Sequence, residues 1–154
     1  MIAVLQRVSS ASVAVDNKTI ARINQGLLVL LGVEKKDDQN IAKKMAGRIL
    51  KYRMFADADD KMNLSVVDIK GSVLVVPQFT LPADTQKGLR PGFSSAAGPE
   101  KGFAMFSQLI DIMRDYGESL DDGLPQKWLQ TGQFGADMAV ELVNDGPVTF
   151  ILKI

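Results

Sequence analysis

The chain has 154 residues, of which 46% are hydrophobic, and its 18 basic and 18 acidic residues give a net charge of zero. It contains no cysteine and no histidine, which excludes thiolate nucleophiles, imidazole bases, iron–sulfur clusters and metal sites that depend on those ligands. Acid–base chemistry is left to Asp, Glu, Lys and Tyr, to hydroxyl groups and backbone dipoles, or to the substrate itself.

The first half of the chain has patterns typical of strands, interrupted by one helical segment. The strands expected there are residues 2–8, 12–15, 19–23, 27–33, 52–56 and 64–67. Residues 27–33 are apolar almost throughout, which predicts a strand buried on both faces. Apolar residues then recur at helical spacing from Ile41 to Ile49, and Asp37 or Asp38 is placed to cap that helix.

The second half continues with a strand at residues 72–79 and a long irregular stretch at 82–100. A second amphipathic helix follows and ends near Gly117. Two last strands, 137–143 and 148–153, are joined by a turn at 144–147. Strands outnumber helices and most connections are short. We therefore expect an α+β fold in a single domain, residues 1–154, with a mainly antiparallel, barrel-like sheet covered by two principal helices.

Two short segments stand out because polar or small residues follow apolar strands there. In one, Gln78, Phe79 and Thr80 come where a strand ends, a position at which a rigid scaffold can present binding groups. Thr80 would need a base to act as a nucleophile, and no histidine exists to supply one. The alternative interpretation is an ordinary turn, with Phe79 in the core.

The other segment contains Asp145, Gly146 and Pro147. Asp-Gly is a strong hairpin-turn signal because glycine accepts positive φ, and proline is tolerated at the first position of a strand. The pattern therefore fits a hairpin turn. The alternative is a rigid backbone element whose carbonyl groups face a ligand, which the pattern alone does not support.

Basic side chains are concentrated between residues 35 and 53, although the whole chain is neutral. Such a face either holds phosphates or is a solvated helix surface. Arg90 lies in the irregular stretch, where it could grip a phosphate or carboxylate. If the basic residues hold phosphates, the candidate contacts are Lys43, Lys44, Arg48, Lys51 and Arg90.

The expected location is the cytoplasm. The first seven residues lack the pattern of a signal peptide, and the longest apolar run, 27–33, is far shorter than the roughly 20 residues that cross a bilayer. No phosphate-binding glycine loop or metal-ligand cluster is evident in the sequence. We expect no cofactor, no metal and no membrane partner.

Several segments of the chain resemble the D-aminoacyl-tRNA deacylases, the D-tyrosyl-tRNA deacylase family, and occur in the same order as in that family. They are residues 7–13, 26–30, 61–64, 77–81, 90–93, 134–138 and 144–149. The Pro-Gln-Phe-Thr-Leu at 77–81 matches the family's Ser-Gln-Phe-Thr-Leu motif at four of five positions. The Arg-Pro-Gly-Phe at 90–93 is similar to its Arg-Pro-Ser-Phe loop. The resemblance covers essentially the whole chain and implies the fold of that family.

The resemblance implies a homodimeric enzyme, with active sites at the subunit interface, that hydrolyses the ester joining a D-amino acid to tRNA. Gln78, Phe79 and Thr80 match the positions at the reacting ester, where backbone N–H groups would stabilise the oxyanion. In such enzymes the terminal 2′-hydroxyl of the tRNA assists the reaction. The implied partners are tRNA and a second copy of the chain, and DNA is not among them.

The resemblance also implies how L-amino acids are rejected. A Gly-cis-Pro element, here Gly146 and Pro147, enters the active site of the other subunit and occupies the space that an L side chain needs. Arg7 matches a position that braces this element, and Met138 one that lines the pocket. Glycyl-tRNA would pass such a filter and is an expected second substrate.

Pro77 departs from the family pattern, because proline has neither the amide N–H nor the hydroxyl of the usual serine. Two other functions therefore stay open. One is a deacylase for small L-amino acids mischarged on tRNA, and the other is a tRNA-binding module without catalysis. Substrate chirality separates the first from a D-specific enzyme, and formation of a deacylated product excludes the second.

Overall fold

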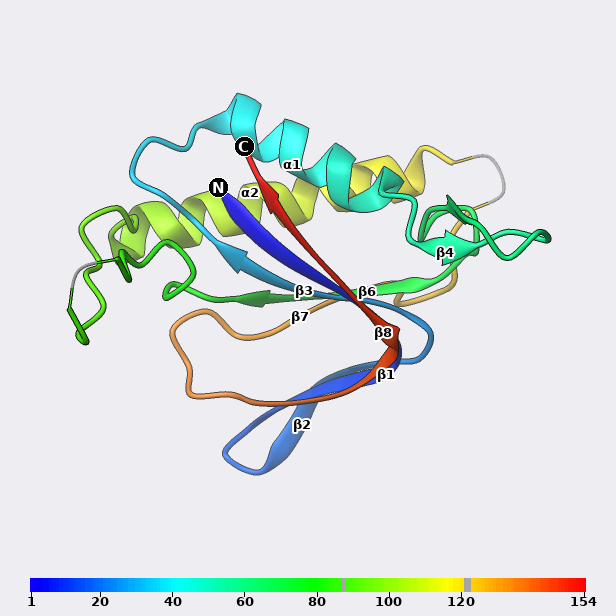
Figure 1. Ribbon diagram of the computed structural model, residues 1–154, viewed down its shortest axis with the longest axis horizontal. Helices are drawn as coiled ribbons and strands as arrows, with labels where there is room; N and C mark the ends of the chain where they lie inside the picture. The colour runs from blue at the N-terminus through cyan, green and yellow to red at the C-terminus, as the bar shows by residue number, and fades with distance from the viewer. Residues whose placement is uncertain (87, 121–122) are drawn as a thin grey trace.

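A curved six-stranded sheet, covered on one face by two helices, forms the body of the protein (Figure 1). The computed structural model describes residues 1–86, 88–120 and 123–154. The strands of the sheet are β1 (Ile2–Val15), β2 (Lys18–Ile23), β3 (Gly26–Gly32), β6 (Ser72–Pro77), β7 (Leu129–Thr131) and β8 (Ala139–Lys153). The helices are α1 (Gln39–Lys51) and α2 (Pro99–Glu118), and a small separate sheet consists of β4 (Phe55–Ala56) and β5 (Met62–Leu64).

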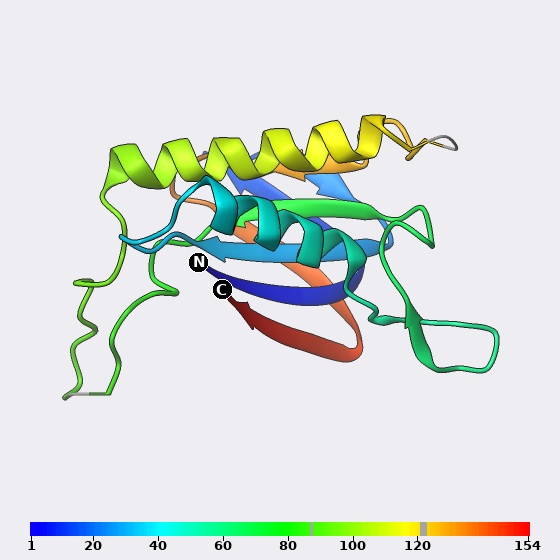
Figure 2. The same ribbon diagram turned by 90° about the horizontal axis from the view of Figure 1, so that it is seen from above.

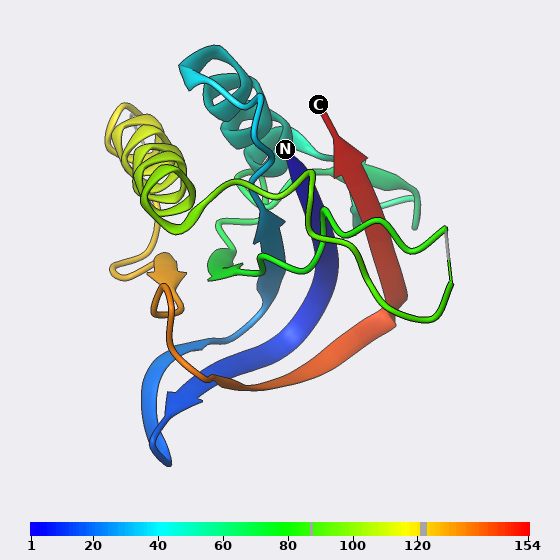
Figure 3. The same ribbon diagram turned by 90° about the vertical axis from the view of Figure 1, so that its left-hand side faces the viewer.

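The strand β1 is the centre of the sheet, since it pairs antiparallel with β2, β3 and β8. The sheet then continues through parallel pairs from β3 to β6 and from β6 to β7. Figure 3 shows how the strands curl into a nearly closed, barrel-like form. Seen from above, α1 and α2 lie next to each other across one face of the sheet (Figure 2). The predicted α+β fold with two principal helices is confirmed.

Alternation along the buried strands supplies two separate cores. On β3, Leu27, Val29 and Leu31 point to the core beneath the helices, while Leu28 belongs to a second core inside the curl of the sheet. The same alternation on β6 divides its residues between the two cores. This accounts for the uninterrupted apolar run in the sequence, because a strand buried on both faces has no polar side.

Of the two aspartates predicted as possible N-caps of α1, Asp37 and Asp38, the structure shows Asp38 in that position. Asp38 is the N-cap, and its carboxylate accepts a hydrogen bond from the amide of Ile41 at 2.9 Å. Asp37 is buried and instead accepts bonds from the amide of Glu34 and from the amino group of Met1, each at 2.7 Å. None of the helices in the described part of the chain is long and apolar enough to cross a membrane.

The predicted hairpin at 144–147 is wrong. The segments 139–144 and 149–153 both pair with β1 and form one continuous strand, β8. Between them the register shifts, because Asn144 pairs with Val8 and Thr149 with Gln6. The five-residue step on β8 against two residues on β1 makes residues 145–148 a bulge rather than a turn.

Other boundaries also differ from the prediction. Residues 2–8 and 12–15 belong to the single strand β1, and β6 ends at Pro77 rather than residue 79. The strand expected at 64–67 lies instead at Met62–Leu64, since Ser65 and Asp68 bond to each other and form a turn. The strand expected at 52–56 is reduced to Phe55–Ala56, and the short β7 was not predicted.

Candidate functional site

The motif at residues 77–81 begins at the last residue of β6 and forms a tight turn that leaves the sheet. The amide of Gln78 still bonds to the carbonyl of Leu31 at 2.8 Å, which holds the start of the turn against β3. The carbonyls of Gln78 and Thr80 then accept bonds from the amides of Leu81 and Ala83. Gln78 is half-buried, whereas Phe79 and Thr80 are exposed. The turn therefore presents its middle residues to solvent from a rigid support.

Two backbone amides of this turn are available to a ligand. Across the described residues, neither the Phe79 nor the Thr80 amide donates a hydrogen bond to another group of the chain. The hydroxyl of Thr80 accepts a 2.6 Å hydrogen bond from Nε2 of Gln78. No carboxylate or amine bonds to that hydroxyl within 1–86, 88–120 or 123–154. The arrangement offers hydrogen-bond donors to a developing oxyanion but no base to activate Thr80.

An aromatic pair covers the turn, so Phe79 is not the core residue of the ordinary-turn interpretation. The ring of Phe79 is 67% exposed and packs against Phe93, with ring centroids 5.6 Å apart. Backbone bonds between Asp84 and Gly92 pin the loop that carries Phe93, and the hydroxyl of Ser95 bonds to the carbonyl of Pro82. The loop is thus held over the motif.

Met138 lies beside the same end of β6. Its sulfur is 2.8 Å from the point where a side chain on Gly132 would begin, and Cδ of Pro77 is 3.3 Å from that point. Because Gly132 has no side chain, Met138 and Pro77 can approach each other there. The role of Gly132 could not be predicted from the sequence, since a single glycine in a polar stretch resembles any loop glycine.

Arg7 organises the bulge in β8. Its Nε donates to the carbonyl of Asp145 at 3.1 Å and lies 3.1 Å from the carboxylate of the same residue. Its Nη1 donates to the buried carbonyl of Met54 at 3.0 Å. The Gly146–Pro147 peptide bond is cis, and φ of Gly146 is 126°. Both residues are exposed, so Arg7 holds a backbone segment that projects from the sheet.

The turn at 78–80 and the bulge segment at 145–147 form two groups of residues that lie apart within one chain. Pro77 pairs with Leu31, which is opposite Ala3, whereas Gly146 and Pro147 lie between the partners of Val8 and Gln6. The groups are therefore three strands apart across the sheet and about 13 Å apart along β1.

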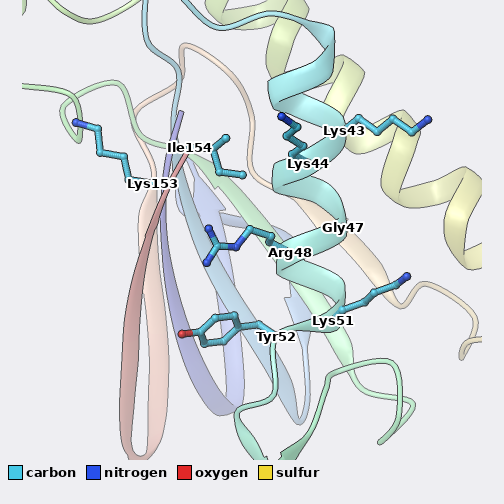
Figure 4. Close-up of a pocket in the computed structure, with 8 residues that line it drawn as sticks. All are labelled: Lys43, Lys44, Gly47, Arg48, Lys51, Tyr52, Lys153 and Ile154. Atoms are coloured by element: carbon cyan, nitrogen blue, oxygen red, sulfur yellow. The ribbon is translucent and has the colours of Figure 1, made fainter.

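The basic residues gather on α1. Lys43, Lys44, Arg48 and Lys51 are exposed, and with neighbouring residues they line a groove of about 770 Å³ that extends to the end of β8 (Figure 4). Lys153, on the far side of this groove, was missed because it is isolated in the sequence. Arg90 is exposed but is not among the residues that line the groove.

Two aspartates whose pKa values are shifted, Asp57 and Asp68, lie outside the motif at 77–81. Hydrogen bonds lower the pKa of Asp57, chiefly from the side chain of Asn63, and lower the pKa of Asp68, chiefly from the hydroxyl of Ser65. Both aspartates belong to the segment around β4 and β5. No cluster of three or more acidic side chains that could hold a metal ion occurs among the described residues.

Comparison with known proteins gives consistent matches. The family model described as D-Tyr-tRNA(Tyr) deacylase matches residues 4–153. The D-aminoacyl-tRNA deacylases of Shewanella sp. (strain MR-4) and Shewanella oneidensis are each 51% identical to this chain over 154 residues, which cover all of both proteins.

Two solved structures share the fold of this chain. One described as "c-Myc DNA Unwinding Element Binding Protein" is 35% identical, with a TM-score of 0.91 over 100% of this chain and 99% of its own. One described as a probable eukaryotic D-amino acid tRNA deacylase shares the fold at 17% identity, with a TM-score of 0.81 over 99% of this chain and 98% of its own. The family model and the curated relatives together show that the chain belongs to the D-Tyr-tRNA(Tyr) deacylase family.

Proposed function

We propose that this protein hydrolyses the ester bond of D-aminoacyl-tRNA and releases the D-amino acid and free tRNA. Membership of the deacylase family gives the reaction class. The observation that carries the proposal to a site is the pair of unbonded amides at Phe79 and Thr80, on an exposed turn without a base. Such donors stabilise the oxyanion of an ester hydrolysis.

In the proposed reaction, water adds to the ester carbonyl and the amides of Phe79 and Thr80 bind the oxygen that becomes negative. The carbon–oxygen bond to the ribose 3′ oxygen then breaks, and that oxygen leaves with a proton. The neighbouring 2′-hydroxyl of the tRNA assists the proton transfer. The side chain of Thr80 does not attack, because no base within residues 1–86, 88–120 and 123–154 bonds to its hydroxyl to remove the proton.

The proposed chirality filter is the segment that Arg7 holds. Backbone carbonyls of Gly146 and Pro147 would project into the active site of a partner subunit and occupy the place of an L side chain, while Met138 lines the pocket. Rejection by a clash leaves glycine acceptable, so glycyl-tRNA is a proposed second substrate. The separation of the two residue groups within one chain supports a homodimer with shared sites.

Further parts of the proposal follow from this substrate. Residues 1–154 act as one domain, and the reaction takes place in the cytoplasm, where charged tRNA is used. The chemistry needs no metal or other cofactor, because the oxyanion donors and the 2′-hydroxyl supply its requirements. DNA is not a substrate, since it lacks the 2′-hydroxyl that assists the reaction.

The test is hydrolysis of matched D- and L-tyrosyl-tRNA by the purified protein without added metal. We expect rapid loss of the D ester alone. Loss of both esters would overturn the chirality filter. Loss of neither, with tRNA still bound, would favour a binding module, and loss of L-alanyl-tRNA instead would identify a deacylase for small L-amino acids.

A further inference from the structure

No ion pair with another of the described residues offsets the positive charge on the exposed face of α1. α1 contains four basic residues and no acidic residue. At 3.6 residues per turn, Lys43, Lys44, Arg48 and Lys51 fall within an arc of about 140°, opposite the buried face of the helix. Lys44 and Arg48 are four residues apart, a spacing at which like charges repel. Arg48 and Lys51 suit the C-terminal end of the helix dipole, but Lys43 and Lys44 lie nearer the other end.

A glycine lies in the middle of this basic face. Gly47 is in the helix interior, where glycine is a poor helix former. A Cβ added to Gly47 would meet no atom within 4 Å, so packing inside the chain does not require the glycine. Its absence of a side chain instead leaves the helix backbone open between the basic residues.

The groove along this face continues toward the motif. In Figure 4, Arg48 on α1 points toward β8, at whose end Lys153 lies, and so does Tyr52 directly after the helix, while Lys43 and Lys51 point to the other side of the helix. Lys153 also borders a second cavity of about 240 Å³, whose lining includes Leu81, the last residue of the motif at 77–81, and Pro82, which follows it. The carboxylate of Glu34 lies 3.8 Å from Nζ of Lys153 and offsets part of the charge of that lysine.

We infer that the groove formed by α1 and Lys153 binds the phosphate backbone of a nucleic-acid stem whose 3′ end reaches the motif. This inference rests on the proposed function for the identity of the stem as the acceptor arm of tRNA. Unbalanced positive charge attracts phosphates, and Gly47 allows a strand to approach the helix backbone. The shared border at Lys153 gives a continuous path from the groove to the reacting turn.

The first test measures binding of an uncharged RNA hairpin with a single-stranded 3′ end, at several salt concentrations. We expect Lys44→Gln with Arg48→Gln to lower affinity by about tenfold or more, and to reduce the slope of log K against log salt by about 1.4 to 1.8, because each lost phosphate contact removes roughly 0.7 to 0.9. The matched control, Lys18→Gln with Arg22→Gln, removes two exposed charges from β2. It should bind as the unchanged protein does.

A second variant tests the groove without changing its charge. Gly47→Leu should fill the open space and weaken RNA binding several-fold, while the better helix former keeps α1 intact. A DNA hairpin of the same sequence distinguishes recognition of the phosphate backbone alone, with equal losses for both, from recognition of an RNA stem. Either pattern of loss supports the groove.

The inference is overturned if the Lys44 and Arg48 variant binds RNA normally, or if the β2 control loses as much affinity. It is also overturned if Gly47→Leu changes the oligomeric state by sedimentation but leaves RNA binding intact, because the face then contacts another copy of the chain. Hydrolysis of D-tyrosyl-tRNA by the unchanged protein is measured separately. Failure of that reaction with normal RNA binding would reject the proposed function and keep the groove.

Discussion

Arg7 joins three parts of the molecule through one guanidinium group. It binds the carbonyl of Met54, which belongs to a fully buried residue, and both the carbonyl and the carboxylate of Asp145. We expect Arg7→Ala to lower the free energy of unfolding by about 1–3 kcal/mol, because a buried acceptor loses its donor. Arg7→Lys should recover only part of this, since one ammonium group cannot reproduce the planar fork.

Urea denaturation at fixed protein concentration measures both changes. If Arg7→Ala unfolds at the same urea concentration as the unchanged protein, the guanidinium does not hold this segment. The same variant should also discriminate less well between D- and L-tyrosyl-tRNA, because the backbone around Gly146 would be less firmly positioned.

Thr80 allows the amide and the hydroxyl to be tested separately. Thr80→Val removes the hydroxyl and keeps the N–H, so turnover should fall by less than about tenfold, as expected when no base activates the oxygen. Thr80→Pro removes the N–H, and loss of one oxyanion donor costs about 10²–10³ in kcat. Single-turnover hydrolysis measures both. Equal losses for the two variants would contradict an oxyanion role for the amide.

Asp68 makes stability depend on pH. The hydroxyl and amide of Ser65 donate to its carboxylate, and with Arg53 nearby they hold its pKa below the ordinary value. A lowered pKa stabilises the fold above the unfolded-state value, about 3.9, and this contribution is lost as pH falls through the folded-state pKa. Asp68→Asn should therefore be less stable than the unchanged protein at pH 6, and the difference should shrink below about pH 4.

Denaturation curves at a series of pH values test this prediction. Asp59→Asn is the matched control, since it replaces an exposed aspartate of the neighbouring turn. A difference between Asp68→Asn and the unchanged protein that stays constant with pH would show that the carboxylate charge is not its cause.

Among the elements, two glycines are expected to respond in opposite ways to alanine. Gly26 begins β3, and a Cβ there would lie 1.8 Å from the carbonyl oxygen of Ser72. Gly26→Ala should therefore cost about 1–3 kcal/mol or more, because the parallel pair of β3 and β6 must separate. Gly47→Ala meets no atom and should stabilise α1 by up to about 1 kcal/mol. Thermal unfolding measures both, and a destabilised Gly47→Ala would show that the glycine has a structural purpose.

The elements also show what the sequence could predict. Apolar runs and helical spacing identified β3, β6 and both helices, because burial on one or two faces leaves a local pattern. The prediction of a hairpin at 144–147 was wrong, although Asp-Gly favours a reversal, because the two arms do not pair with each other. Here β1 pairs with both arms, which no local pattern reveals. The short strand β7 was not predicted for the same reason, since its three residues form a strand only by pairing with β6.

For the whole molecule, the proposed sharing of active sites between subunits predicts complementation. Thr80→Pro should inactivate the motif, and Gly146→Leu should obstruct the site that its segment enters. If the site combines both groups from different subunits, a mixed dimer has one site with both defects and one with neither. Equal mixing after reversible unfolding should then restore roughly a quarter of the activity of the unchanged protein.

Activity that stays absent after mixing, with mixed dimers present, would show that each site is built within one chain. The sequence motifs identified both groups of residues by resemblance, but their separation across the sheet required the structure. Likewise, the basic stretch was evident in the sequence, whereas its continuity with the motif depends on Lys153, which the fold brings from the far end of the chain.

The pairing of β1 with β8 also bears on how the protein folds. β1 and β8 lie far apart in the sequence, at residues 2–15 and 139–153, yet their partners include Ile2 with Lys153. The sheet therefore remains incomplete until β8 has been synthesised, and the loop that must close between the two strands is long. Such long-range pairing slows folding and leaves the apolar edge of β1 exposed during synthesis. The nascent chain is thus expected to need protection from aggregation until its final strand arrives.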